Sequence, residues 1–427
     1  MRIVSLAFAA MFAFTQTGWA FCGFYVATSD QPLVNKASRV VLAHVDDHTM
    51  VTMASDVSGD PKEFAIVVPV PTVIKREQVR LVKPETVEHL ADFTKPRLVE
   101  YYDPNPCPPP PPPGGYPVMA AAAPPMPAPA PPPMGVHVEA QYSVGEYDVV
   151  VLSATDSGGL LTYLARNHYR IPRGAAPTVG SYIRQHMHFF LAKVNIARMQ
   201  SSGSSFLRPI QVEYSSPKFM LPIRLGTVNA TGPQDMIVLA LTQRGRIETT
   251  NYRTARMPTG IDVPRFVQQQ FGQFYDAAFD RQVAANGGDA VFLEYAWDIG
   301  SMMCDPCSAP AMSEDELHEL GAGWIRAGAT PWATPGPLFV TRLHVRYDRE
   351  HFPEDLQFQE TPDRENFQVR FVTHHPFAGD TSCAAGEKYK AMLSERSASE
   401  ASTLARLTGW SPGVISGRME ATHEQVK

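Results

Sequence analysis

The sequence has little charge and, beyond its first twenty residues, no long apolar run. Charged residues make up 19% of the 427 residues, the net charge is −6, and no basic patch is present, which disfavours nucleic acid as a partner. The longest later apolar run, 64–74, is interrupted by prolines. Because a membrane-spanning helix needs about 20 apolar residues, we expect no transmembrane segment in the mature chain.

Cysteine is also scarce, and all five copies follow an N-terminal segment with the features of a leader. Arg2 precedes an apolar core at 3–14, and Gly18 and Ala20 are small residues at the two positions that a signal peptidase reads. This pattern predicts a secretory signal peptide at 1–20 and a mature chain in the periplasm or outside the cell. We therefore expect the cysteines to work in an oxidising compartment.

Proline, by contrast, is abundant: there are 39, and sixteen of them lie between Pro104 and Pro133. Such a stretch lacks backbone donors and cannot build a core, so we expect a polyproline II or disordered insertion. It is either a ligand for a proline-binding groove, a spacer or, more simply, a tolerated surface insertion. The predicted division is a signal peptide at 1–20, a strand-rich part at 21–103, the proline-rich disordered insertion at 104–135 and a body at 136–427 that completes the same fold.

Hydrophobic periodicity predicts an α+β fold, with a mixed, mostly antiparallel sheet or sheets, interspersed helices and disulfide bracing. Asp46 and Asp47 separate two strands of a hairpin, and Ser313 begins a capping box. The expected strands are 39–45, 48–53, 64–71, 147–152, 189–194, 210–214, 222–225, 236–241, 290–297, 338–347 and 367–372. The expected helices are 85–93, 157–167, 179–185, 263–284, 314–321 and 384–407, with Gly409 past the end of the last. Because of its prolines, we expect the far end of 64–71 to lie at the edge of a sheet or to leave the sheet.

The sharpest chemical motif is Cys304-Asp-Pro-Cys307. Two thiols at this spacing can form a local disulfide, supply half of a metal site, or act as a redox pair. In redox pairs of the thioredoxin type, the first thiol lies at a helix N-terminus, which lowers its pKa. Here the nearest helix signal begins at Ser313 and is acidic, which would raise a thiol pKa. A structural bridge is therefore favoured over a catalytic pair of Cys304 and Cys307.

The five cysteines leave one unpaired if the others form disulfides. Choosing the odd one in five ways and pairing the other four in three ways gives 15 schemes. The disulfide candidates are Cys22, Cys107, Cys304, Cys307 and Cys383. A bridge that closes a long loop stabilises a protein by roughly 2–4 kcal/mol, which suits Cys22, Cys107 and Cys383 at points where the chain would otherwise fray.

His186-Met187-His188 is a second candidate constellation. If a strand includes all three residues, both imidazoles point to one face and can begin a copper or zinc site, with Met187 as a soft ligand. The alternative is that the histidines are solvated polar residues and the methionine fills a gap in the core. His374-His375 is ambiguous in the same way. We favour the alternative and expect no bound metal or other cofactor.

Several motifs with a known chemistry are missing from the sequence: His-Glu-x-x-His, the phosphate-binding Gly-x-x-x-x-Gly-Lys and the EF-hand loop. No catalytic residue is assigned on this basis, and a non-enzymatic role is favoured. Asn35, Lys36, Asp60 and Lys62 are polar residues beside expected strands and can line a groove, although turn chemistry explains Gly59-Asp60-Pro61 equally well.

Several blocks of sequence resemble an uncharacterised family of exported bacterial proteins that is defined only as a domain of unknown function. The blocks are FCGFYV at 21–26, NKAS at 35–38, GDPK at 59–62, VVPVP at 67–71, PRLVEY at 96–101, AKVN at 192–195, LPIRLG at 221–226, NYR at 251–253, CDPC at 304–307 and LTGW at 407–410. The resemblance implies export and a shared architecture but no activity. The segment 186–188 departs from the pattern of that family.

Together these features predict an exported protein, periplasmic or secreted, that binds a ligand or supports the cell envelope. Its partner is expected to be an envelope protein or a small ligand. The alternatives are a thiol–disulfide oxidoreductase that uses Cys304 and Cys307, and a periplasmic copper- or zinc-handling protein that uses His186 and His188.

Overall fold

The computed structural model describes residues 24–27, 34–58, 64–107, 138–169, 174–201, 207–228, 230, 232–299, 309–325 and 336–424. These residues form an α+β fold with mixed, mostly antiparallel sheets and a disulfide, as the sequence predicts. Within these ranges, no helix has both the length and the apolar character that a membrane crossing requires.

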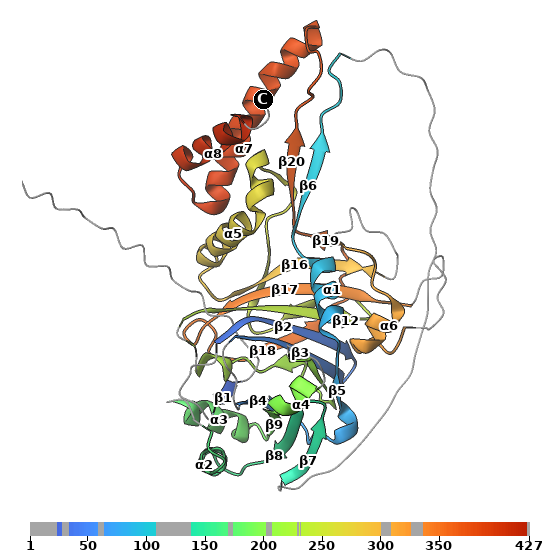
Figure 1. Ribbon diagram of the computed structural model, residues 1–427, viewed down its shortest axis with the longest axis vertical. Helices are drawn as coiled ribbons and strands as arrows, with labels where there is room; N and C mark the ends of the chain where they lie inside the picture. Colours follow the sequence, from blue (N-terminus) through green and yellow to red (C-terminus); the bar gives the residue numbers. More distant parts are fainter. Residues whose placement is uncertain are drawn as a thin grey trace, which may run out of the picture.

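A nine-stranded sheet occupies the middle of the molecule (Figure 1). Its order is β14 (Arg253–Arg256), β16 (Ala290–Asp298), β17 (Phe339–Tyr347), β12 (Gln234–Thr242), β2 (Val34–Val45), β3 (His48–Ser58), β10 (Ile210–Ser215) and β5 (Val79–Leu81), with β19 (Phe367–Gln368) paired to β16. The predicted hairpin is β2 and β3, and its turn places Asp46 at φ 51°, a conformation that aspartate tolerates. β2 also pairs in parallel with β12, so the sheet joins strands from before and after the proline-rich segment.

A five-stranded sheet lies on one side of the large sheet, with order β1 (Phe24–Ala27), β4 (Phe64–Val70), β9 (His188–Val194), β8 (Tyr147–Leu152) and β7 (Val138–Val144). β4 is buried along its whole length, as predicted. β1 pairs only with residues 64–67, so Pro69 has β9 on one side and lies beyond the end of β1 on the other. A proline without a backbone donor fits this position.

Two three-stranded sheets complete the β structure. One has the order β11 (Met220–Leu221), β18 (Leu356–Glu360) and β13 (Ile247–Thr249). The other has the order β15 (Ile261–Asp262), β20 (Arg370–His375) and β6 (Arg97–Tyr102). β6 and β20 pair in parallel and run away from the large sheet beside α7 (Ala384–Thr408), as Figure 1 shows.

The helices cover the outer faces of the sheets. α1 (Pro84–Thr94) and α6 (Glu314–Glu319) cover one face of the large sheet, and α2 (Ser157–Arg166) and α3 (Ala175–Arg184) cover the five-stranded sheet. The remaining helical segments are α4 (Ile196–Ser201), α5 (Phe271–Ala285), α8 (Pro412–Glu424), η1 (Arg76–Gln78), η2 (Gly226–Val228) and η3 (Arg265–Gln270). Ser313 forms the predicted capping box of α6 with Glu316.

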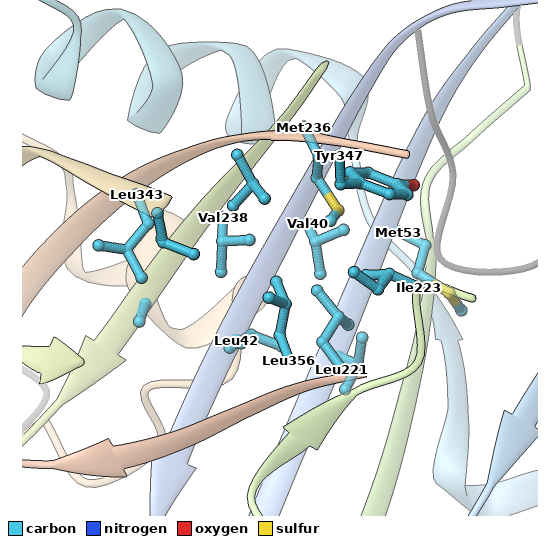
Figure 2. Close-up of a cluster of buried hydrophobic side chains, with 14 of the residues drawn as sticks. Val40, Leu42, Met53, Leu221, Ile223, Met236, Val238, Leu343, Tyr347 and Leu356 are labelled. Carbon is cyan, nitrogen blue, oxygen red and sulfur yellow. The ribbon is translucent and has the colours of Figure 1, made fainter. Parts of the chain in front are cut away.

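Side chains alternate along the central strands, so one strand contributes to two cores. In β12, Val238 belongs to the main core, whereas Leu239 faces the core beneath α1 and α6. Figure 2 shows the centre of the main core, which contains Val40, Leu42, Met53, Leu221, Ile223, Met236, Val238, Leu343, Tyr347 and Leu356. A band buried on both faces explains why these strands are almost continuously apolar in sequence.

Several predicted elements differ from the structure. The strand expected at 367–372 is divided into β19, which joins the large sheet, and β20, which belongs to a three-stranded sheet. The helix expected at 263–284 is divided into η3 and α5, because Gln270, the last residue of η3 and the N-cap of α5, has a non-helical conformation (φ −128°, ψ 27°). The strand expected at 222–225 is instead β11 followed by a turn, for a reason given below. Gly409 ends α7 at φ 72°, as expected, but a further helix, α8, follows it.

Candidate functional site

The predicted cysteine sites are only partly described. Cys22, Cys304 and Cys307 lie outside the described residues, so catalysis by Cys304 and Cys307 stays a prediction. Cys107 and Cys383 form a disulfide; their Cα atoms are 6.1 Å apart, and their sequence separation is 276. The bridge joins the segment after β6 to the N-cap of α7 and, for such a long loop, contributes roughly 2–4 kcal/mol of stability.

The histidines of 186–188 do not share a strand face, because β9 begins only at His188. His186 is exposed at φ 58°, where it ends α3: its N–H donates to the Ile183 carbonyl at 2.9 Å, and that of Met187 donates to the Tyr182 carbonyl at 3.1 Å. These two bonds form a Schellman motif at the C-terminus of α3. The conformation of His186 is therefore that of a helix cap, and metal binding is not needed to explain it. Burial lowers the pKa of His188 below its usual value, and Met187 is buried in the core beneath α2 and α3.

The other predicted polar residues are dispersed. His374 and His375 are neighbours on β20. The Nε2 atom of His374 lies 3.2 Å from Oδ1 of Asp262, and Nε2 of His375 lies 2.7 Å from Oε2 of Glu100. Asn35 and Lys36 belong to β2. Asp60 and Lys62 lie outside the described residues. In the part of the chain that the structure describes, no three histidine, cysteine, aspartate or glutamate residues are gathered as a metal ion requires.

The structure instead reveals a cleft of about 400 Å³ between the end of α3 and the sheet of β11, β18 and β13. Its buried floor consists of Phe219, Met220, Asp355 and Phe358, with Arg224 half-buried beside them. The exposed rim consists of Gln185, Pro217, Lys218, Thr250, Glu354 and Gln357. We call this the Asp355 cleft.

Asp355 organises the floor of this cleft. Its Oδ1 atom accepts hydrogen bonds from the Tyr182 hydroxyl at 2.6 Å and from the backbone N–H groups of Ile223 at 2.9 Å and Arg224 at 3.2 Å. Its Oδ2 atom accepts from the Arg224 guanidinium, from Nε at 3.1 Å and from Nη2 at 2.9 Å. These backbone donors are therefore engaged by a side chain and not by a ladder, which is why 222–225 is not a strand.

The protonation states of the floor follow from this arrangement. Burial and the neighbouring Asp355 raise the pKa of Tyr182 well above its usual value, so its hydroxyl stays protonated and donates. Burial alone would lower the pKa of Arg224, but its hydrogen bonds to Asp355 raise it. The Arg224 guanidinium also lies over the Tyr182 ring, 4.7 Å from the centroid. The buried polar atoms of Tyr182, Arg224 and Asp355 all have hydrogen-bond partners.

The rim carries opposite charges above partly apolar walls. Glu354 accepts a hydrogen bond from Asn251 at 3.0 Å, and Asn251 also donates to the Asp355 carbonyl at 2.8 Å. Across the residues that the structure describes, no carboxylate pairs with the Lys218 ammonium. The floor contributes the rings of Phe219 and Phe358, whose centroids are 5.3 Å apart. The cleft thus offers an unpaired cation, a carboxylate and an aromatic surface.

Sequence reasoning did not find this cleft, because its residues come from segments that are far apart in the chain. Tyr182, Lys218 and Asp355 belong to no recognised local motif. The available signal lay in two of the blocks quoted for the family resemblance: LPIRLG at 221–226 supplies Arg224, and NYR at 251–253 supplies Asn251.

The fold and this cleft define an α+β protein with a polar cleft of about 400 Å³. Residues 17–359 match the family described as an uncharacterized protein conserved in bacteria (DUF2330). The chain belongs to this family, which confirms the predicted resemblance to an uncharacterised bacterial family, and the matched range contains every residue that lines the Asp355 cleft. Searches of curated proteins and of solved structures found no match.

Proposed function

We propose that this protein is an exported binding protein that holds a small polar ligand in the Asp355 cleft. The observation that carries this proposal is the cleft itself. Its volume of about 400 Å³ falls within the range of roughly 300–1,000 Å³ that is typical of small-molecule sites. Its floor is fixed by the hydrogen bonds of Asp355, so a ligand would meet a preformed surface and lose little affinity to reorganisation.

The charges on the rim narrow the class of ligand. Lys218 attracts an anionic group, and the Glu354 carboxylate accepts hydrogen bonds from a donor or an ammonium group. Phe219 and Phe358 provide apolar contact for the remainder of the molecule. Amino acids and dipeptides have this combination of groups, and we propose them as the ligand class.

Removing the unpaired rim charge tests this proposal. Calorimetric titration of the mature protein with a panel of amino acids and dipeptides is expected to identify a saturable ligand. Lys218→Ala should weaken its binding roughly tenfold to a hundredfold, because a hydrogen bond to a charged group is lost. Lys388→Ala, an exposed lysine on α7, is the matched control and should bind as the unmodified protein does. If no member of the panel binds, or if Lys218→Ala binds equally well, the proposal is wrong.

The export part of the proposal is supported by two observations. The sequence at 1–20 has the features of a signal peptide, and the Cys107–Cys383 disulfide suits an oxidising compartment. The thiol–disulfide and metal-handling alternatives remain predictions from the sequence.

Intact-mass measurement on protein purified from a bacterial envelope fraction tests export. Cleavage after Ala20 should give a mass that corresponds to a chain beginning at Phe21, reduced by the two hydrogens of each disulfide. A chain that retains Met1 would contradict export.

A further inference from the structure

A second, smaller cleft lies at the end of the molecule that is formed by η3, β20, α7 and α8. Its volume is about 120 Å³, and its lining residues are Pro264, Arg265, Phe266, His374, Pro376, Leu393, Arg396, Ser397, Glu400 and Met419. α8 packs on η3 and on α7. Figure 1 shows α7 and α8 at the upper end of the molecule. We call this the Arg265 cleft.

The cleft contains one cation with unmet hydrogen-bonding capacity. The Nε atom of Arg265 is buried and has no hydrogen-bond partner, and no carboxylate pairs with Arg265 in the described ranges. Arg396, in contrast, is occupied: its Nη1 and Nη2 atoms donate to Asp103 at 3.0 and 2.8 Å. Among the described residues, the Ser397 hydroxyl also has no hydrogen-bond partner. A guanidinium that lines a cleft and pairs with no described carboxylate is suited to an anionic ligand.

We propose that the Arg265 cleft binds a short-chain carboxylate, with the carboxylate on Arg265 and Ser397 and the alkyl chain against the apolar walls. Leu393, Met419 and Phe266 form those walls. A volume of about 120 Å³ equals the liquid volume of roughly four water molecules and is below the ~150 Å³ of a cavity that accepts benzene. The cleft therefore suits a molecule of the size of propionate.

Glu400 makes this binding depend on pH. Its side chain is 11% exposed and its Oε1 atom lies 3.7 Å from Nε of Arg396, without a hydrogen bond to it. Burial raises the pKa of Glu400 to about 7, with Asp262 and Asp103 acting in the same direction and Arg396 against it. Below that pH the neutral carboxyl group donates a hydrogen bond to a bound carboxylate, and above it the ionised group repels the ligand.

Charged groups from every neighbouring element face this region. They are Arg396 on α7, Asp103 after β6, Asp262 on β15, His374 on β20, Arg265 on η3 and Arg418 on α8. Arg418 is engaged with the Trp410 ring, 4.4 Å from its centroid, and Asp103 is neutralised by Arg396. The charge that a bound carboxylate can neutralise is therefore that of Arg265, and Glu400 is the lining carboxyl group whose ionisation opposes binding.

Titration of the full mature chain with sodium propionate, at constant ionic strength in chloride, tests this proposal. The affinity should be roughly tenfold higher at pH 6 than at pH 8, because the protonated fraction of a group with a pKa of about 7 changes by that factor. His374 also lines the cleft, so this control is made in a His374→Gln background, where Glu400→Gln should bind equally at both pH values. Arg265→Gln should lose at least roughly tenfold in affinity at pH 6. Arg281→Gln, an exposed arginine on α5, should match the unmodified protein.

Two results would overturn the proposal: propionate that does not saturate the protein at pH 6, or equal affinity in Arg265→Gln. Should Arg265→Gln fail to fold, Glu400→Gln in the His374→Gln background decides instead, and a pH dependence that survives there contradicts the proposal. Inorganic phosphate that binds more tightly than propionate would also contradict it. Lys218→Ala should leave propionate binding unchanged, so this test is independent of the Asp355 cleft.

Discussion

Replacing Glu294 with glutamine will lower the free energy of unfolding by about 3–5 kcal/mol, because it leaves a buried cation without its counter-charge. Glu294 lies on β16 with its side chain fully buried. Its carboxylate accepts hydrogen bonds from Arg342 Nε at 2.6 Å, from His344 Nδ1 at 2.8 Å and from the Tyr275 hydroxyl. The glutamine side chain has a similar shape, so the loss of unfolding free energy comes from the missing charge and not from a cavity. Urea denaturation at pH 7 measures it.

The effect of this substitution should fade in acid. Burial alone would raise the pKa of Glu294, but His344 and Arg342 outweigh it and lower the pKa from 4.5 to about 2. A carboxyl group with a depressed pKa in the folded state contributes stability above its unfolded pKa, and this contribution is lost as the pH falls through the folded value. The difference between the two proteins should therefore be full above pH 4.5 and shrink between pH 4.5 and 2.

Tyr275→Phe is the matched control for this network. It removes one hydrogen bond to Glu294 but leaves the pair with Arg342 intact, so we expect a smaller loss of about 1.5–3 kcal/mol. If Glu294→Gln costs no more than Tyr275→Phe at pH 7, the buried charge pair does not stabilise the fold as proposed.

Replacing Asp355 with asparagine should have a similarly large effect, about 3–5 kcal/mol of unfolding free energy. The half-buried Arg224 guanidinium would lose its counter-charge, and the asparagine amide can present only one carbonyl oxygen to the donors that now share two. Asp355 holds the segment after β11 against β18 and α3, so this substitution should destabilise the whole fold. The loss of unfolding free energy is measured by chemical denaturation and checked by thermal unfolding.

A double-mutant cycle with Arg224→Gln separates the ion pair from the other contacts of Asp355. The two residues are in direct contact, so the losses should couple by about 0.5–3 kcal/mol instead of adding. Strictly additive losses would show that the pair itself contributes nothing. Tyr182→Phe, which removes only the hydroxyl bond at 2.6 Å, should cost less than Asp355→Asn.

Local patterns predicted the elements whose causes are local. The hairpin of β2 and β3 follows from alternating strands around Asp46 and Asp47, and α6 follows from the capping box of Ser313 and Glu316. Gly409 marks the end of α7 because glycine adopts the left-handed conformation without strain. These signals operate within a few residues and need no knowledge of the partner segments.

The sequence by itself determined the α+β class, about half of the strands, most helices, the family resemblance and the leader-like N-terminal pattern. Only the tertiary structure decided which cysteines among those described are joined, that His186 and His188 are separated by a helix end, and that 222–225 is a turn held by Asp355. The tertiary structure also decided both clefts. Their residues come from segments up to about 170 positions apart in the sequence, such as Tyr182 and Asp355. Local propensity cannot predict a contact between such segments, because they meet only when the sheets pack.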